Sequence, residues 1–183
     1  MSRFLKYHYQ AMEAYTPGEQ PRDMQYIKLN TNESPYPPAP SVVAAMDAEQ
    51  AEFLRLYPDP TAKNLKEKLA GLYDVAPENV FVSNGSDEVL NFAFMAFADE
   101  DHPLVFPAIT YGFYPVFAEL NRIPYEEIPL ENDFTIDFDK YCGINKNIVI
   151  ANPNAPTRML LRVDEIEHIV RSNPENVVVI DEA

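Results

Sequence analysis

The chain has 183 residues, of which 46% are hydrophobic and 23% charged, so it can form a globular domain with a buried core. Acidic residues outnumber Lys and Arg by 29 to 14, and the net charge of −15 argues against a nucleic-acid partner, because no basic stripe is present to neutralise phosphates. The single cysteine, Cys142, excludes an intrachain disulfide, and no apolar run approaches the length of a membrane span.

The first third of the chain contains short helical patterns separated by prolines. Residues 3–15 are loosely helical and are expected to form an arm that docks elsewhere, and residues 27–30 form a short extended piece. Apolar side chains at helical spacing predict a helix over residues 41–56, which the proline-containing segment 57–60 ends. A second amphipathic helix is predicted over residues 61–73.

Residues 80–97 organise the chain, because they predict a strand, a tight glycine turn and a helix in succession. The strand is expected over residues 80–82, and Gly85 tolerates the positive φ of a turn. Ser86 can cap the helix, and Asp87 suits its positive first turn. A glycine turn that opens a helix leaves backbone N–H groups free to bind an anion. The alternative is an ordinary connection without a ligand, which is the commoner case for one short glycine motif.

Strands and helices alternate in the rest of the chain. Strands are predicted over 104–107, 122–130, 147–151 and 177–180, and helices over 111–120 and 163–172. Apolar strands that alternate with helices require a mostly parallel sheet covered on both faces. The fold class is therefore α/β.

Polar side chains follow two of these strands, at the end where parallel sheets bind their ligands. Asp181 is either a carboxylate that pairs with a protonated ring nitrogen or a cap at the strand end. The segment Asn152–Thr157 contains two X-Pro bonds, one of them a candidate for the cis form. It is either a rigid turn only, or a turn whose Asn side chains hydrogen-bond a phenolic oxygen.

Two tyrosines complete the candidate set. Tyr111 opens a predicted helix and is either a core residue, as Tyr114 is expected to be, or a ring that lies flat against an aromatic ligand. Tyr57 sits in a turn, so its hydroxyl is free to reach a phosphate. None of the three histidines lies at metal-ligand spacing from Cys142 or from another histidine, and we predict no metal site.

Six segments then occur in a recognisable order. They are Leu29–Tyr36, Tyr57–Pro60, Ser83–Glu88, Thr110–Tyr114, Asn152–Thr157 and Asp181–Ala183. In this order and at this spacing they resemble the histidinol-phosphate aminotransferases, which are pyridoxal-phosphate (PLP) enzymes of fold type I. The resemblance implies a three-layer, mostly parallel α/β large domain over residues 36–183, incomplete here, preceded by a helical arm and substrate-side segment over residues 1–35.

The resemblance also implies roles for individual residues. The turn at Gly85 and the backbone N–H groups of Ser86 and Asp87 would hold the PLP phosphate, which agrees with the anion site expected at this helix start. Tyr111 would stack on the pyridine ring. Asp181 would pair with the pyridinium nitrogen and keep it protonated.

The remaining implied roles concern the outer parts of the site. Asn154 would bond the phenolic oxygen of PLP, since Ala155 occupies the position where the family usually has that Asn. Tyr57 would reach the phosphate of a neighbouring subunit's cofactor in a homodimer, and Asn32 and Tyr36 would line the substrate side. Arg158 replaces the family's Gly, and it would cost about 1 kcal/mol if the turn needs a positive φ there.

The function implied is PLP-dependent transamination between histidinol phosphate and 2-oxoglutarate or glutamate in histidine biosynthesis. No lysine follows Lys146, so the Schiff-base lysine of the family is missing, and we expect this chain to be an inactive N-terminal part with no catalytic residue of its own. A threonine-phosphate decarboxylase, an aromatic aminotransferase and an inactive PLP- or phosphate-binding module stay open as alternatives. We expect a cytoplasmic protein whose partners are an amino-acid phosphate and a 2-oxo acid, with no nucleic acid or membrane.

Overall fold

The computed structural model describes residues 6–10, 12, 23, 24, 27, 29, 34, 36–46 and 54–183. The chain divides into two compact units. One contains Met1–Tyr15 and Ser83–Ala183, and the other contains Thr16–Val82. No helix among the described residues is long and apolar enough to cross a membrane.

The described part of the Thr16–Val82 unit is helical. Its elements are α2 (Pro40–Ala45), α4 (Lys63–Tyr73) and the 3-10 helix η1 (Pro77–Asn79). The helix predicted over 41–56 is wrong at its C-terminal end, because residues 54–56 form a turn and a bend. Helix α2 ends at Ala45 and has no buried residue, and residues 47–53 of the predicted helix lie outside the described part of the chain.

Residues 80–82 do not form the predicted strand. Val80 has extended backbone angles, φ −110° and ψ 120°, but the segment is not one of the strands of the described sheet. Phe81 is 62% exposed. The apolar pattern therefore agrees with the extended backbone of Val80 but is wrong about the strand, because a strand also needs a neighbour that supplies ladder hydrogen bonds.

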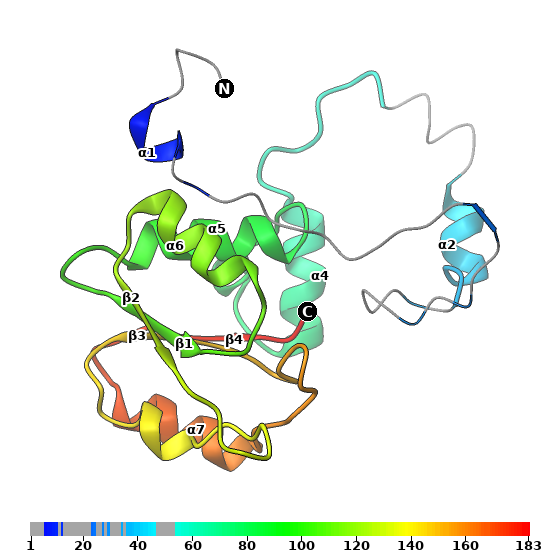
Figure 1. The fold of residues 1–183 in the computed structure, drawn as a ribbon. Coiled ribbons are helices and arrows are strands. Elements are labelled where there is room, and N and C mark those ends of the chain that lie inside the picture. Colours follow the sequence, from blue (N-terminus) through cyan, green and yellow to red (C-terminus); the bar gives the residue numbers. More distant parts are fainter. Residues whose placement is uncertain are drawn as a thin grey trace. The chain divides into compact units, whose positions relative to one another are not determined.

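The other unit is built on a parallel sheet. Its strands are β1 (Leu104–Pro107), β2 (Tyr125–Ile128), β3 (Asn147–Ala151) and β4 (Val178–Asp181), in the order β2-β1-β3-β4. Its helices are α1 (Tyr7–Gln10), α5 (Ser86–Phe97), α6 (Phe113–Asn121), η2 (Phe138–Tyr141) and α7 (Val163–Ser172). Helices α5 and α6 cover one face of the sheet and α7 covers the other (Figure 1), which confirms the three-layer α/β class.

The two central strands are buried on both faces. Leu104 and Phe106 of β1 belong to the core that α5 and α6 cover, whereas Val105 between them belongs to the core that α7 covers. Strand β3 alternates in the same way. This double burial explains why both strands are uninterrupted apolar runs in the sequence, and both have their predicted bounds.

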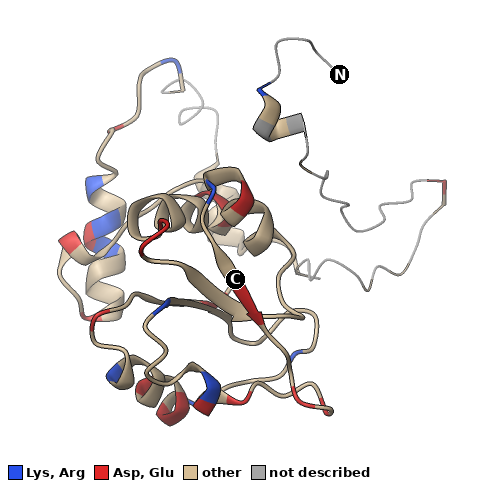
Figure 2. Ribbon diagram, turned by 60° about the vertical axis from the view of Figure 1, so that its left-hand side comes forward, with Lys and Arg blue, Asp and Glu red and all other residues tan. Residues whose placement is uncertain are grey.

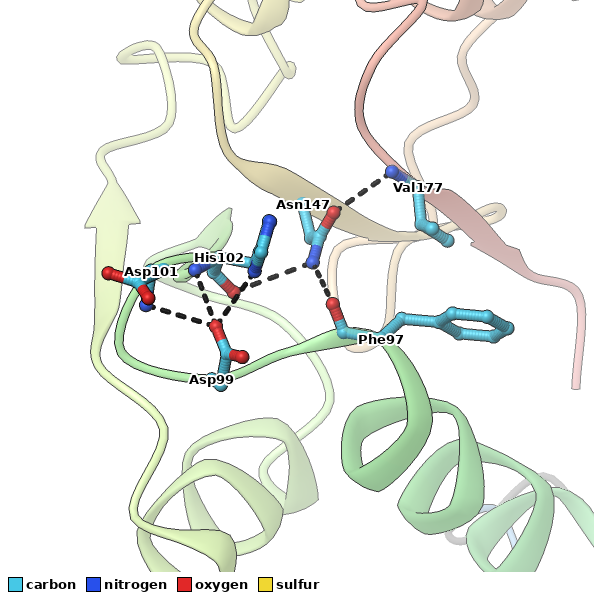
Figure 3. A network of polar contacts seen from close by, with 6 residues as sticks. All are labelled: Phe97, Asp99, Asp101, His102, Asn147 and Val177. Carbon is cyan, nitrogen blue, oxygen red and sulfur yellow. Dashed lines mark hydrogen bonds and ion pairs between the residues drawn. The ribbon is translucent and has the colours of Figure 1, made fainter.

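At the amino ends of the strands, the buried amide of Asn147 ties three segments together (Figure 3). Its Nδ2 donates to the backbone oxygens of Phe97 at 2.6 Å and His102 at 3.4 Å, and its Oδ1 accepts from the N–H of Val177 at 2.9 Å. The Asp99 carboxylate accepts from the N–H of His102 at 2.8 Å and orders the intervening loop. The end of α5 and the starts of β1 and β4 are thereby held to β3.

Candidate active site

The start of α5 has a backbone that only glycine adopts readily. Gly85 stands at the N-cap with φ 82° and ψ 170°. A Cβ built there would meet nothing within 4 Å, so glycine is favoured at this position by its backbone angles and not by a lack of space for a side chain. The prediction that Ser86 caps the helix is wrong, because Ser86 is the first helical residue. Glu88 instead accepts from the N–H of Asn84 at 3.0 Å and from the Ser83 hydroxyl, and these hydrogen bonds lower the pKa of its carboxyl.

This helix start has the features from which an anion site is predicted. Gly85 has no side chain to cap the helix, and Ser86 and Asp87 are both exposed. The first N–H groups of an α-helix have no partner within the helix, and the helix dipole adds partial positive charge to them. A phosphate or carboxylate is the group that such a terminus binds.

A chain of side-chain contacts runs from this helix start to the end of β4. The Tyr111 hydroxyl donates to Asp87 Oδ1 at 2.8 Å. The ring of Tyr111 meets that of Tyr114 edge on, with centroids 5.6 Å apart and an interplanar angle of 82°. The Tyr114 hydroxyl in turn donates to Asp181 Oδ2 at 2.7 Å. Three predicted site residues are thus brought to one edge of the sheet, and Tyr114 is the link between them.

Tyr114 is a core residue, as predicted, and its hydroxyl has a role that the sequence reasoning missed. Its ring is fully buried, 5.7 Å from the ring of Phe106 and 6.4 Å from that of Phe94. Burial, and then the hydrogen bond to Asp181, raise the pKa of Tyr114, so its hydroxyl stays protonated and donates. Asp181 Oδ1 also accepts from the N–H of Ala183 at 3.1 Å, and the orientation of this half-buried carboxylate is therefore fixed.

Asn154 is fully buried in the loop that follows β3. Its Nδ2 donates to the backbone oxygen of Ile109 at 2.9 Å and to Thr157 Oγ1 at 3.0 Å, and its Oδ1 accepts from Thr110 Oγ1 at 2.8 Å. Both amide hydrogens are used inside the protein. The observed contacts make Asn154 a brace between the loops after β1 and β3, and its binding to a phenolic oxygen stays a prediction.

The same loop has an irregular backbone. The Asn152–Pro153 and Ala155–Pro156 bonds are both cis, whereas the sequence suggested one. Asn152 is buried, and its amide exchanges hydrogen bonds with the N–H and backbone oxygen of Leu161 at 2.8 and 3.2 Å. Arg158 has φ +62°, so it occupies the left-handed region that would favour glycine.

Three predicted site residues belong to the Thr16–Val82 unit. Tyr57 is fully exposed and Tyr36 is 80% exposed. Their contacts with a partner's phosphate and with substrate stay predictions, and Asn32 lies outside the described residues.

Comparison with known proteins places this site in a family. A family model described as aminotransferase class I and II matches residues 24–183. The chain is 50% identical over 183 residues to the histidinol-phosphate aminotransferase of Brachyspira hyodysenteriae, covering 100% of this chain and 52% of that protein. It is 47% identical to the histidinol-phosphate aminotransferase of Clostridium acetobutylicum over the same shares. The chain thus spans about half the length of the curated relatives it matches.

Solved structures confirm the fold. The histidinol-phosphate aminotransferase of Sinorhizobium meliloti, in complex with pyridoxal-5'-phosphate, superposes with a TM-score of 0.75 at 24% identity, over 84% of this chain and 43% of that one. A mutant aspartate aminotransferase of Thermus thermophilus superposes with a TM-score of 0.78 at 21% identity, over 99% of this chain and 51% of that one.

Proposed function

The chain belongs to the class I and II aminotransferase family, and on that premise we propose that it supplies part of the PLP site of a histidinol-phosphate aminotransferase. The reaction proposed is amino transfer between histidinol phosphate and 2-oxoglutarate. The substrate rests on the names of relatives that are about 50% identical to this chain. The observation that carries the site is the contact chain Asp87–Tyr111–Tyr114–Asp181, which runs from the anion-binding helix start to a fixed carboxylate.

The residues present fit PLP. The phosphate suits the N–H groups at the start of α5, where Gly85 leaves the helix without a side-chain cap. The aromatic ring suits Tyr111, which is half-buried between that helix start and Tyr114. When bound, PLP supplies an electron-accepting ring that stabilises negative charge on the substrate's α-carbon.

Asp181 has the central electrostatic role in this proposal. Its carboxylate would hold a proton at the pyridine nitrogen of bound PLP, because an adjacent negative charge favours the protonated form of the ring. Tyr114 fixes the direction of that carboxylate through a 2.7 Å hydrogen bond. Because Tyr114 is buried and stays protonated, it only donates to Asp181 and does not compete for the ring's proton.

These residues bind and orient, and the covalent chemistry needs an amine from elsewhere. The sequence contains no lysine after Lys146, which pairs with Glu126 at the amino ends of the strands. We therefore assign no catalytic residue to the described part of the chain.

The proposal is tested with the polypeptide encoded by the complete reading frame that contains this sequence. We expect amino transfer from histidinol phosphate to 2-oxoglutarate, and much slower transfer from phenylalanine or tyrosine. Release of CO₂ from threonine phosphate without amino transfer would show a decarboxylase instead. PLP binding without turnover of any of these substrates would identify a binding module.

Oligomeric state and location are part of the same proposal. We propose that two copies form a homodimer in which Tyr57 reaches the phosphate bound by the partner, and that the enzyme works in the cytoplasm. Replacement of Tyr57 by Phe should then weaken PLP binding in the dimer. Sedimentation of the active protein as a monomer would contradict the shared site.

A further inference from the structure

A second cluster of chemically reactive side chains lies on the face of the sheet that α7 covers. Asp139 and Cys142 come from η2 and the residue that follows it, and His168 comes from α7. Their ligand atoms, one carboxylate oxygen, one sulfur and one ring nitrogen, all lie within 4.8 Å of one another. Tyr114 and Asp181, which belong to the proposed PLP site, are on the other side of the sheet, toward α5 and α6.

The local structure presents these three groups together. Helix η2 places Cys142 one turn after Phe138, so that the Cys142 thiol donates to the backbone oxygen of Phe138 at 3.4 Å. The ring of His168 packs edge on against the ring of Phe138, with centroids 5.9 Å apart and an interplanar angle of 88°. Phe138 therefore holds the imidazole and the thiol on the same side of the η2–α7 contact.

The donor set matches a borderline transition-metal ion. One thiolate, one imidazole and one carboxylate are three of the ligand types that Zn²⁺ takes, and a water completes the tetrahedron in open sites. Bonds of about 2.0–2.3 Å separate ligand atoms by roughly 3.3–3.8 Å, so small rotations of the exposed Asp139 and His168 close the present spacing. The hard ions Ca²⁺ and Mg²⁺ prefer oxygen ligands and would leave Cys142 unused.

The surrounding charge also favours a cation. A pocket beside the cluster is lined by Phe138, Asp139, Arg162, Asp164, Glu165 and His168. Its three carboxylates face a single guanidinium, which already pairs with Asp164 at 3.0 Å and Glu165 at 3.3 Å. Acidic and basic residues both colour α7 in Figure 2, and at this pocket the acidic ones are in excess.

We propose that Asp139, Cys142 and His168 bind one Zn²⁺ ion, which fastens η2 to α7. On binding, the Cys142 thiol loses its proton to solvent and its sulfur forms the metal bond, while His168 binds through a neutral ring nitrogen. The site rests on the geometry of this face and is independent of the proposed transamination. The sequence concealed it because Cys142 and His168 are separated by 26 residues, without the short spacings of a zinc motif.

Cobalt(II) titration of untagged, PLP-free protein tests the site, because thiolate coordination gives a charge-transfer band that oxygen and nitrogen ligands do not. We expect saturation at one equivalent, displacement by Zn²⁺, and a higher melting temperature with Zn²⁺ than without it. Cys142→Ser should abolish the band, and His168→Gln and Asp139→Asn should each weaken binding at least tenfold.

His102→Gln is the matched control. His102 is also an exposed imidazole in contact with a carboxylate, since its Nδ1 lies 2.8 Å from Asp99 Oδ1, and its loss should leave the titration unchanged. The proposal is overturned if no saturable band forms. It is equally overturned if the band and its midpoint survive in His168→Gln, because Cys142 alone would then be capturing the ion.

Discussion

Asn147 and Asp181, at opposite ends of the parallel sheet, are held in different ways. At the amino ends, Asn147 is buried and bonds only to backbone atoms, which fixes three segments and leaves nothing to a ligand. At the carboxyl ends, the carboxylates of Asp87 and Asp181 bond to tyrosine hydroxyls and remain partly or fully exposed. Polar groups that bond to the backbone hold the fold together, whereas oriented carboxylates with free surface are the ones that can meet a ligand.

The largest effect is expected at the amino ends. Replacement of Asn147 by Ala removes three hydrogen bonds that join three segments of backbone, so the free energy of unfolding should fall by roughly 3 kcal/mol. Urea denaturation measures the loss. The affinity of the folded protein for PLP, corrected for the fraction that is unfolded, should not change. A stability equal to that of the wild-type protein would mean that water replaces the amide at no cost, and would remove the contrast between the two ends.

At the carboxyl end, replacement of Asp181 by Asn should have the opposite consequence: activity should fall and stability should change little. The carboxamide keeps the shape but not the charge that we propose holds the ring's proton, so kcat of the complete enzyme should fall by roughly a hundredfold, with little loss of stability. Glu182→Gln is the control, because it removes an adjacent exposed charge that has no assigned role. Equal rates for Asp181→Asn and Glu182→Gln would remove Asp181 from the site.

A smaller effect is expected for Tyr114, which in the proposed site would act on the ring only through Asp181. Tyr114→Phe keeps the buried ring but releases the carboxylate, so kcat/KM should fall about tenfold. The raised pKa of Tyr114 keeps its hydroxyl protonated, so the loss should be the same at every pH in the neutral range. Tyr125→Phe removes a hydroxyl that donates to Glu119 at 3.3 Å, and this matched change should leave kcat/KM as it was.

The smallest expected effects are changes in stability caused by substitutions in the two loops that flank β3. The loop entering β3 places Gly143 and Asn145 at positive φ, which both residues tolerate, but the loop leaving it places Arg158 there. Arg158→Gly should therefore stabilise the protein by up to about 1 kcal/mol, and Gly143→Ala should destabilise it by a similar amount. Thermal or urea unfolding measures both. Arg158→Lys should change nothing, and a destabilised Arg158→Gly would show that the arginine side chain contributes more than its backbone costs.

The helix and strand bounds that sequence predicted well belong to elements with one dominant local pattern. Strands β1 and β3 are apolar on both faces, and α7 has a strong apolar stripe with acidic residues in its first turn. The wrong predictions concern segments whose conformation depends on contacts with residues far away in the sequence. Residues 54–56 form a turn and a bend, Val80 is extended outside the described sheet, and Gly85 occupies the N-cap predicted for Ser86.

The sequence by itself determined the α/β class, the family resemblance and the choice of candidate positions such as Asp87, Tyr111 and Asp181, because periodicity, turn chemistry and short motifs are local properties of a chain. Only the tertiary structure decided that Tyr114 holds Asp181, 67 residues away, that Asn154 braces Ile109 across 45 residues, and that Cys142 meets His168. These contacts depend on strand order and register, such as Ala151 opposite Asp181, and on which side of a strand each side chain points. Those are properties of the assembled sheet, and no stretch of sequence contains them alone.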